Sequence, residues 1–109
     1  MKAPDTRYEV YRQGDVLVMR VDAVPAEAEQ VPWDGRIVLA YGEVTGHAHA
    51  ISTAQAKMYS TQGERYLAVP AEAKLVHEEH ATITLPAGFY RVIQQREYVP
   101  EAAPRDVAD

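Results

Sequence analysis

Apolar and polar side chains alternate along several short stretches of the chain, and residues that favour turns separate these stretches. Residues 16–21 (VLVMRV) place apolar side chains on both faces of a strand, which is expected to be covered on both sides, and residues 36–41 (RIVLAY) form a short apolar run. Residues 89–99 (FYRVIQQREYV) are expected to form a long last strand. An alternation with a period of two is typical of a β-strand, whose side chains point to opposite faces in turn. The pattern predicts about eight strands, with turn signals roughly every 8 to 12 residues. The expected strands are 10–21, 36–41, 47–52, 57–60, 65–69, 74–78, 81–85 and 89–99.

Glycines, prolines and small polar residues mark the connections between these strands. Gly14 and Asp15 predict a bulge or a tight bend within residues 10–21. Pro86-Ala87-Gly88 predicts a turn, and so do residues 61–64. Residues 23–35 contain two prolines and end in Trp-Asp-Gly, which indicates a surface loop with one helical turn at 26–30.

These elements, without an amphipathic helix or an internal repeat, predict an all-β fold built as a small single-domain barrel, sandwich or β-roll. We expect residues 1–99 to form the domain. Residues 100–109 contain two prolines and few apolar side chains, so we expect a flexible C-terminal tail. A small β-domain with an exposed apolar face also favours a homo-oligomer.

Composition and charge exclude several classes of function. The 109 residues carry a net charge of -5, which argues against nucleic acid as a partner because phosphate binding needs a basic face. The absence of cysteine excludes disulfides, zinc–thiolate sites and cysteine nucleophiles. Neither a signal-peptide pattern nor an apolar run of about 18 residues occurs, so we expect a cytoplasmic protein that makes no use of a membrane.

All four histidines fall into two close pairs, His47-Ala48-His49 and His77-Glu78-Glu79-His80. Imidazole is the commonest protein ligand of transition metals and titrates near neutral pH. Side chains at positions i and i+2 of a strand share a face, so His47 and His49 are predicted to point into one cavity.

His77 and His80 are three positions apart, and a regular strand would place them on opposite faces. They can serve one site if a turn or bulge at Glu78-Glu79 intervenes, with His77 closing one strand and His80 opening the next. The sequence then predicts a divalent metal site with four imidazole nitrogens, or with three nitrogens and a carboxylate.

Nitrogen ligands without thiolate suit Zn, Fe(II), Mn, Ni or Cu(II), and the residue types alone do not choose among them. Glu43, Glu78 and Glu79 lie close enough in sequence to supply a further ligand, an outer hydrogen-bond partner or a general base. Simple solvation of each glutamate is the competing interpretation. Three histidines with an open position would be typical of a catalytic site, and four of a closed structural one.

Two motifs resemble those of the cupin superfamily: GEVTGHAH at residues 42–49 and TLPAGFYRV at 84–92. The resemblance implies a small β-barrel that binds a divalent metal through the HxH motif, here His47 and His49. The acidic residue that cupins carry beyond HxH is missing from residues 50–56, and no histidine follows Pro86-Ala87-Gly88. His77 and His80 would therefore replace the missing ligands.

Most of the chain also resembles a small bacterial and phage-associated family of hypothetical proteins. The similar strings are YRQGDVL, GEVTGHAH, HEEH, LPAGFYRV and QREYVP. This resemblance implies a single domain and transfers no activity.

Three functions follow from the histidine pairs. The first is a small metalloenzyme whose metal activates water or dioxygen for a small-molecule ligand, with Glu43, Glu78 or Glu79 moving protons. The second is a binding or assembly module in which the metal only joins strands. The third is a pH-responsive module whose paired histidines repel each other when protonated.

Overall fold

Eight strands make up the regular structure of this protein in a computed structural model that describes residues 9–42 and 44–95. They are β1 (Val10–Gln13), β2 (Val16–Val21), β3 (Glu29–Val31), β4 (Arg36–Tyr41), β5 (Ala48–Ser52), β6 (Lys57–Thr61), β7 (Glu64–His77) and β8 (His80–Gln94). Within the described ranges, no helix is long and apolar enough to span a bilayer. The tail predicted at residues 100–109 lies outside these ranges.

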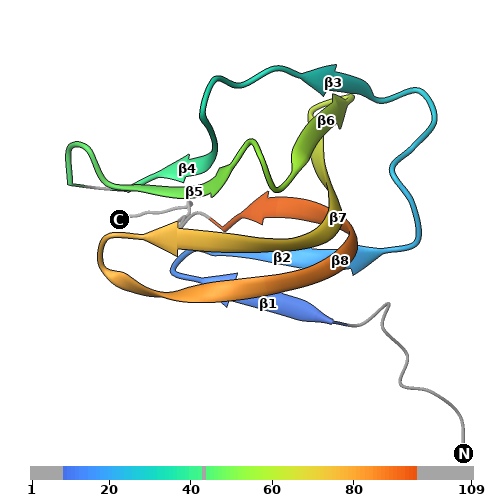
Figure 1. Ribbon diagram of the computed structural model, residues 1–109. Helices are drawn as coiled ribbons and strands as arrows, with labels where there is room; N and C mark the ends of the chain where they lie inside the picture. The colour runs from blue at the N-terminus through green and yellow to red at the C-terminus, as the bar shows by residue number, and fades with distance from the viewer. Residues whose placement is uncertain (1–8, 43, 96–109) are drawn as a thin grey trace, which may run out of the picture.

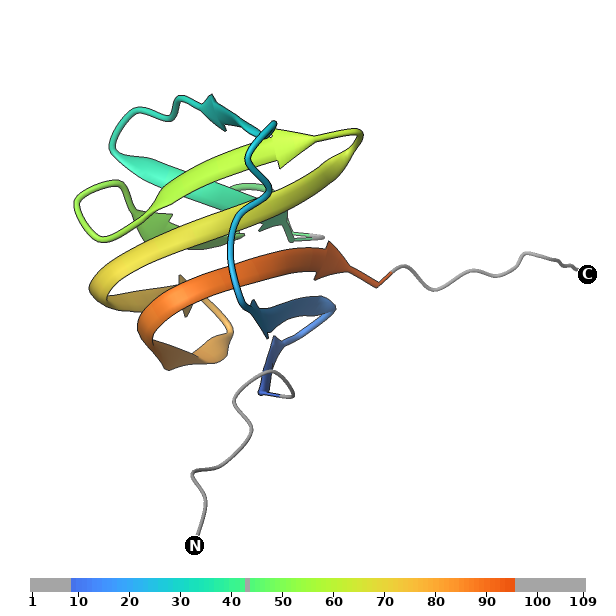
Figure 2. The same ribbon diagram turned by 90° about the vertical axis from the view of Figure 1, so that its right-hand side faces the viewer.

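The strands form one antiparallel arrangement in the order β1-β2-β8-β7-β5-β4, and β6 pairs with both β7 and β3. The long strands β7 and β8 bend strongly, so that β4 and β5 lie over the layer that contains β1, β2 and β8 (Figure 1). Figure 2 shows the same curvature from the side. The predicted all-β class is therefore confirmed. The sheet is not closed into a barrel and fits the description of a small sandwich or roll.

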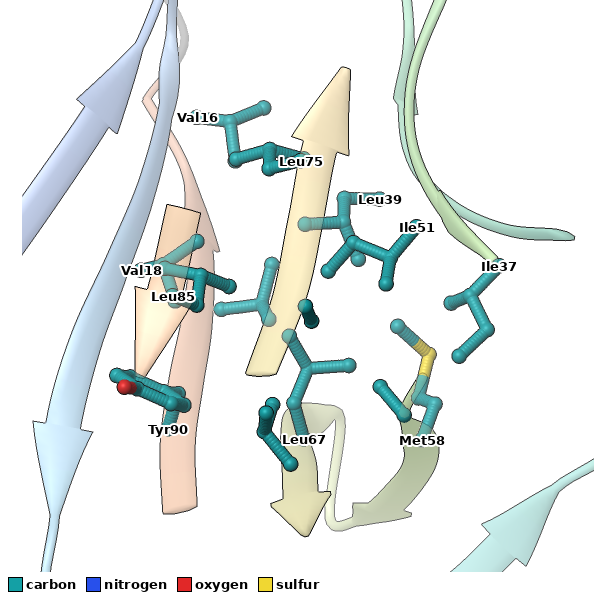
Figure 3. Packing of buried hydrophobic residues seen from close by; sticks show 14 of the residues in the cluster. Val16, Val18, Ile37, Leu39, Ile51, Met58, Leu67, Leu75, Leu85 and Tyr90 are labelled. Atoms are coloured by element: carbon teal, nitrogen blue, oxygen red, sulfur yellow. The ribbon is translucent and has the colours of Figure 1, made fainter. Parts of the chain in front are cut away.

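The hydrophobic core fills the space between these layers. Val18 of β2, Ile51 of β5 and Leu85 of β8 have no exposed surface, and Leu39 of β4 is almost as buried. Figure 3 shows these side chains on the two sides of β7. Burying each such side chain contributes roughly 1.5–3 kcal/mol. His49 shares a face of β5 with Ile51, so the core holds the strand that carries this histidine.

The turn predicted at Pro86-Ala87-Gly88 is wrong, because this segment lies inside β8. The segments expected at 65–69 and 74–78 belong to one continuous strand, β7, which ends at His77, so that Glu78 lies in the turn that follows. Between them the register shifts from Val69↔Gly88 to Glu72↔Pro86, which places an extra residue on β7. A bulge allows proline and glycine to lie within a bent pair of strands. Because these residue types are also typical of turns, the sequence indicated a turn here.

Residues 10–21 form a hairpin rather than one bulged strand. Gln13 pairs with Val16, and Gly14 adopts a φ of 58° in the two-residue turn between them, so the tight bend is the alternative that the structure contains. The helical turn predicted at 26–30 is wrong at its end, because residues 29–31 form β3 and pair with β6. A partner strand offers these backbone groups the ladder hydrogen bonds that an isolated helical turn would lack.

Candidate metal centre

Three segments that are distant in sequence meet at one end of the domain. They are the β1–β2 turn, the start of β5 and the β7–β8 turn (Figure 1). His77 is the last residue of β7, His80 is the first of β8, and the two are register partners. Glu78 and Glu79 form the turn between them. The bend on which a shared site depended is thus present in the structure.

His49, His77 and His80 form a compact cluster of imidazoles. One nitrogen from each ring lies within 4.8 Å of the nitrogens of the other two. The ring centroid of His49 is 4.2 Å from that of His77 and 5.7 Å from that of His80. Two ligands of one tetrahedral ion are about 3.3–3.4 Å apart when each metal–nitrogen bond is 2.0–2.1 Å long. Modest side-chain rotations would therefore bring the three nitrogens to one ion.

Gln13 fixes the orientation and the tautomer of His49. Both residues are 3% exposed. The Gln13 Nε2 donates to the carbonyls of Leu75 (3.0 Å) and Ala81 (2.9 Å), which leaves its Oε1 facing His49 Nδ1 at 2.8 Å. Because that oxygen can only accept, Nδ1 carries the proton and Nε2 presents a lone pair. This is the hydrogen bonding that metal-ligating histidines ordinarily have.

His77 is less well prepared for a metal than His49. Its Nδ1 accepts a hydrogen bond from the backbone N–H of Glu79 at 2.9 Å, so its Nε2 carries the proton when the ring is neutral. Coordination through Nε2 would require a change of tautomer and the loss of this exposed hydrogen bond. We therefore expect His49 to contribute most to metal affinity.

Two glycines line the cluster closely. A Cβ at Gly14 would lie 3.0 Å from His80 Nε2 and 3.1 Å from His49 Cε1. A Cβ at Gly42 would lie 3.1 Å from His77 Nε2. The backbone therefore reaches the nitrogen atoms themselves, and larger residues at these positions would fill the space that an ion and its ligands need.

The cluster forms part of the wall of an open pocket of about 1150 Å³. All four histidines line it, together with the charged residues Arg12, Asp15 and Glu79. A solute can thus approach the imidazoles from one side, while the core closes the other side.

His47 does not join the cluster. Strand β5 begins at Ala48, so His47 belongs to the preceding turn, where its N–H donates to the carbonyl of Val44 at 3.0 Å. Its Nδ1 lies 2.6 Å from Glu79 Oε2, in a contact whose angles are poor for a hydrogen bond. The shared face that was expected for His47 and His49 requires both to lie on a regular strand. A ligand role for His47 stays a prediction.

The predicted glutamates have different surroundings. Glu78 Oε1 accepts a hydrogen bond from the backbone N–H of Ala48 at 3.0 Å, which holds the pKa of this carboxyl below its usual value. Glu78 thereby ties the β7–β8 turn to the start of β5. Glu79 lies against His47. Glu43 lies outside the described residues, and the catalytic roles of all three stay predictions.

Residues 12–95 match the family described as Domain of unknown function (DUF8820). The chain belongs to this family. The match includes every histidine, and it agrees with the resemblance to a family of hypothetical proteins. No curated protein and no solved structure matches the chain, and no cupin resemblance is shown.

Reasoning from sequence missed two residues next to the histidines of this DUF8820 domain: Gln13, which is buried behind His49, and Asp15, which lines the pocket. Gln13 follows Tyr11 at the alternate position of β1, so a polar side chain stands where the alternation predicts the covered face. A buried polar residue needs partners, which was the available signal. Asp15 carried no such signal, because it lies in a turn where aspartate is common.

The metal-free DUF8820 domain is expected to lose stability in acid through His49. Burial lowers the pKa of His49, with the charge of His77 as a second cause. An unfolded chain protonates this ring near pH 6.5, whereas the folded protein resists protonation, so the unfolded state binds more protons below that pH. The free energy of unfolding should therefore decrease as the pH falls from about 7 towards 5, by up to about 1.4 kcal/mol per pH unit for one proton.

Urea unfolding in the presence of a chelator at several pH values measures this dependence. A His49→Asn variant should show a shallower decrease than the parent. An equally steep decrease in the His49→Asn variant would contradict the assignment to His49.

Proposed function

We propose that this DUF8820 domain binds a divalent transition-metal ion through His49, His77 and His80 and presents it to the open pocket. The convergence of three imidazoles, from β5 and from both ends of the β7–β8 turn, is the observation that carries the proposal. The lone pair that Gln13 imposes on His49 Nε2 supports it further.

Three nitrogen ligands at the wall of a pocket favour an ion with an exchangeable position. Imidazole suits Zn, Cu, Fe and Ni, and an accessible ion of this kind can polarise a bound small molecule or lower the pKa of bound water. A pocket of about 1150 Å³ has room for a small-molecule ligand beside the ion. A small metalloenzyme is therefore the first form of the proposal.

A structural role is the second form, and the pairing of β5 with β7 favours it. The ladder between these strands contains the single register pair Ala50↔Val76. His49 lies on β5, whereas His77 and His80 lie at the tip of the neighbouring hairpin. An ion held by these side chains would join two elements whose backbone pairing is short, and a small domain gains appreciably from such a link.

Titration of chelator-treated protein with Zn²⁺, Co²⁺, Mn²⁺, Ni²⁺ and Cu²⁺ in a calorimeter tests the proposal. We expect one equivalent of at least one of these ions to bind with a dissociation constant of about 1 μM or lower, or about -8 kcal/mol. Failure of all five ions to bind at micromolar concentrations would refute both forms. Azide added to the Co²⁺ protein should shift its visible spectrum if a position is exchangeable, and should leave it unchanged if the site is closed and structural.

A further inference from the structure

We propose that Asp15 is a fourth protein ligand of this ion, so that the complete site holds three imidazole nitrogens and one carboxylate oxygen. The inference rests on the proposed function and extends the site to the β1–β2 turn. Four protein ligands complete a tetrahedral ion, so this site supports the structural form of the proposed function, and the metalloenzyme form would require a fifth, exchangeable position. A carboxylate ligand also affects which ion the site prefers. Mn²⁺ prefers oxygen ligands, so the carboxylate improves the fit of Mn²⁺ relative to that of Cu²⁺.

The separation of Asp15 from His49 fits two ligands of one ion. Asp15 Oδ1 lies 3.6 Å from His49 Nε2. Two ligand atoms bonded at 2.0–2.2 Å to a tetrahedral ion are about 3.3–3.6 Å apart. A hydrogen bond between nitrogen and oxygen is shorter, with a usual upper distance of about 3.2 Å. The spacing of these two atoms therefore matches a shared ion better than a direct hydrogen bond. Asp15 lies outside the group of three imidazoles whose nitrogens are all within 4.8 Å of one another, so the ion would have to draw its carboxylate closer to His77 and His80.

The polarity of the two atoms points to the same conclusion. Gln13 accepts the Nδ1 proton of His49, so the Nε2 lone pair faces the carboxylate oxygen of Asp15. Two acceptors that face each other repel unless a cation or a proton lies between them. A metal ion between the two atoms removes the repulsion.

The carboxylate of Asp15 is also held in the required orientation. Its Oδ2 accepts a hydrogen bond from Gln94 Nε2 at 3.0 Å, which leaves Oδ1 directed at His49. The backbone carbonyl of Asp15 accepts from the N–H of Gln95 at 2.7 Å, which ties the β1–β2 turn to the end of β8. A ligand whose second oxygen is hydrogen-bonded is typical of ordered metal sites.

Co²⁺ titrations of the full chain test the inference with three variants. We expect Asp15→Asn to weaken Co²⁺ binding by about 10- to 100-fold and to change the position or intensity of the visible band. Mn²⁺ binding should weaken by a larger factor than Cu²⁺ binding. Asp34→Asn, which changes another exposed turn aspartate, is the matched control and should bind like the parent. Asp15→His should keep tight binding with a shifted spectrum, because a ligand replaces a ligand.

The outcomes separate this inference from the proposed function. If Asp15→Asn binds Co²⁺ within about twofold of the parent and with the same spectrum, Asp15 is not a ligand. If His80→Ala also binds Co²⁺ like the parent, the imidazole site itself is wrong. Melting in the presence of chelator should give similar transitions for Asp15→Asn and the parent. If Asp15→Asn does not fold, loss of Co²⁺ binding by a folded Asp15→His would overturn the inference.

Discussion

Replacing His49 with alanine is expected to lower the affinity of the protein for Zn²⁺ by about 1000-fold or more, because loss of an outer-shell partner alone ordinarily costs 10- to 100-fold. His49 is the buried member of the cluster, with its ring centroid 4.2 Å from that of His77 and 5.7 Å from that of His80. It is also the proposed ligand whose tautomer is already set, through Gln13. No reorganisation of this ring is needed when the ion binds, so its loss should have the largest effect.

His47→Ala is the matched control, because it removes an imidazole two positions away that does not belong to the cluster. We expect Zn²⁺ affinity to remain within about threefold of the parent value, or 0.7 kcal/mol. Competition with a chromophoric chelator measures both variants on one scale. An equal loss at His47 and His49 would restore the four-imidazole site that the HxH motif predicted and would contradict the three-histidine cluster.

The position of His47 illustrates why the sequence predicted the site only in part. The HxH motif assigns both histidines to one face only if the strand covers both, and the observed strand begins at Ala48. One residue at a strand boundary decides the outcome, and boundaries depend on the turn before the strand. Here that turn is closed by the hydrogen bond from Gly42 N–H to the His47 carbonyl at 2.8 Å.

The second histidine pair was the more informative one. His77 and His80 could serve one site only if a turn or bulge at Glu78-Glu79 joined two strands, and strand signals on both sides of the pair indicated such a connection. His77↔His80 pairing across Glu78-Glu79 is a local feature, so the sequence was sufficient to suggest it. The all-β class was predictable for the same reason, because alternation is local.

The partners of the cluster were not predictable, because they come from distant parts of the chain. Gln13 hydrogen-bonds to His49, Leu75 and Ala81, which are 36, 62 and 68 positions away. Only the order of the strands brings β1 next to the β7–β8 hairpin. Long-range pairing also explains why Pro86 and Gly88 do not form the turn that their residue types indicate. Both lie inside β8 and pair with β7 on either side of a bulge.

Saturating Zn²⁺ is expected to raise the melting temperature of the metal-free protein by roughly 10–20 °C. An ion that binds the folded state alone stabilises it by about 2.7 kcal/mol when its concentration is 100 times the dissociation constant. For a domain of this size, 1 kcal/mol shifts the melting temperature by about 4–8 °C. Calorimetry of the chelator-treated protein with and without Zn²⁺ measures the shift.

His80→Ala supplies the control for this shift, since it removes a proposed ligand from an exposed position at the start of β8. Its melting temperature in chelator should stay close to that of the parent, whereas the rise with Zn²⁺ should be largely lost. Mg²⁺, which prefers oxygen ligands in an octahedron, should leave both proteins unchanged. A full Zn²⁺-dependent rise in His80→Ala would locate the stabilising ion away from the cluster.

Amide hydrogen exchange with and without Zn²⁺ distinguishes the two forms of the proposed function. Ala50 and Val76 form the single register pair between β5 and β7. Exchange of the backbone amides around this pair reports on the contact between β5 and the β7–β8 hairpin. If the ion mainly links these elements, their exchange should slow by more than global stabilisation requires, because local opening of the hairpin tip would then break metal bonds. If the ion mainly serves the pocket, exchange at these amides should slow only in proportion to global stability. Greater protection of these amides than global stabilisation explains would favour the structural role over the catalytic one.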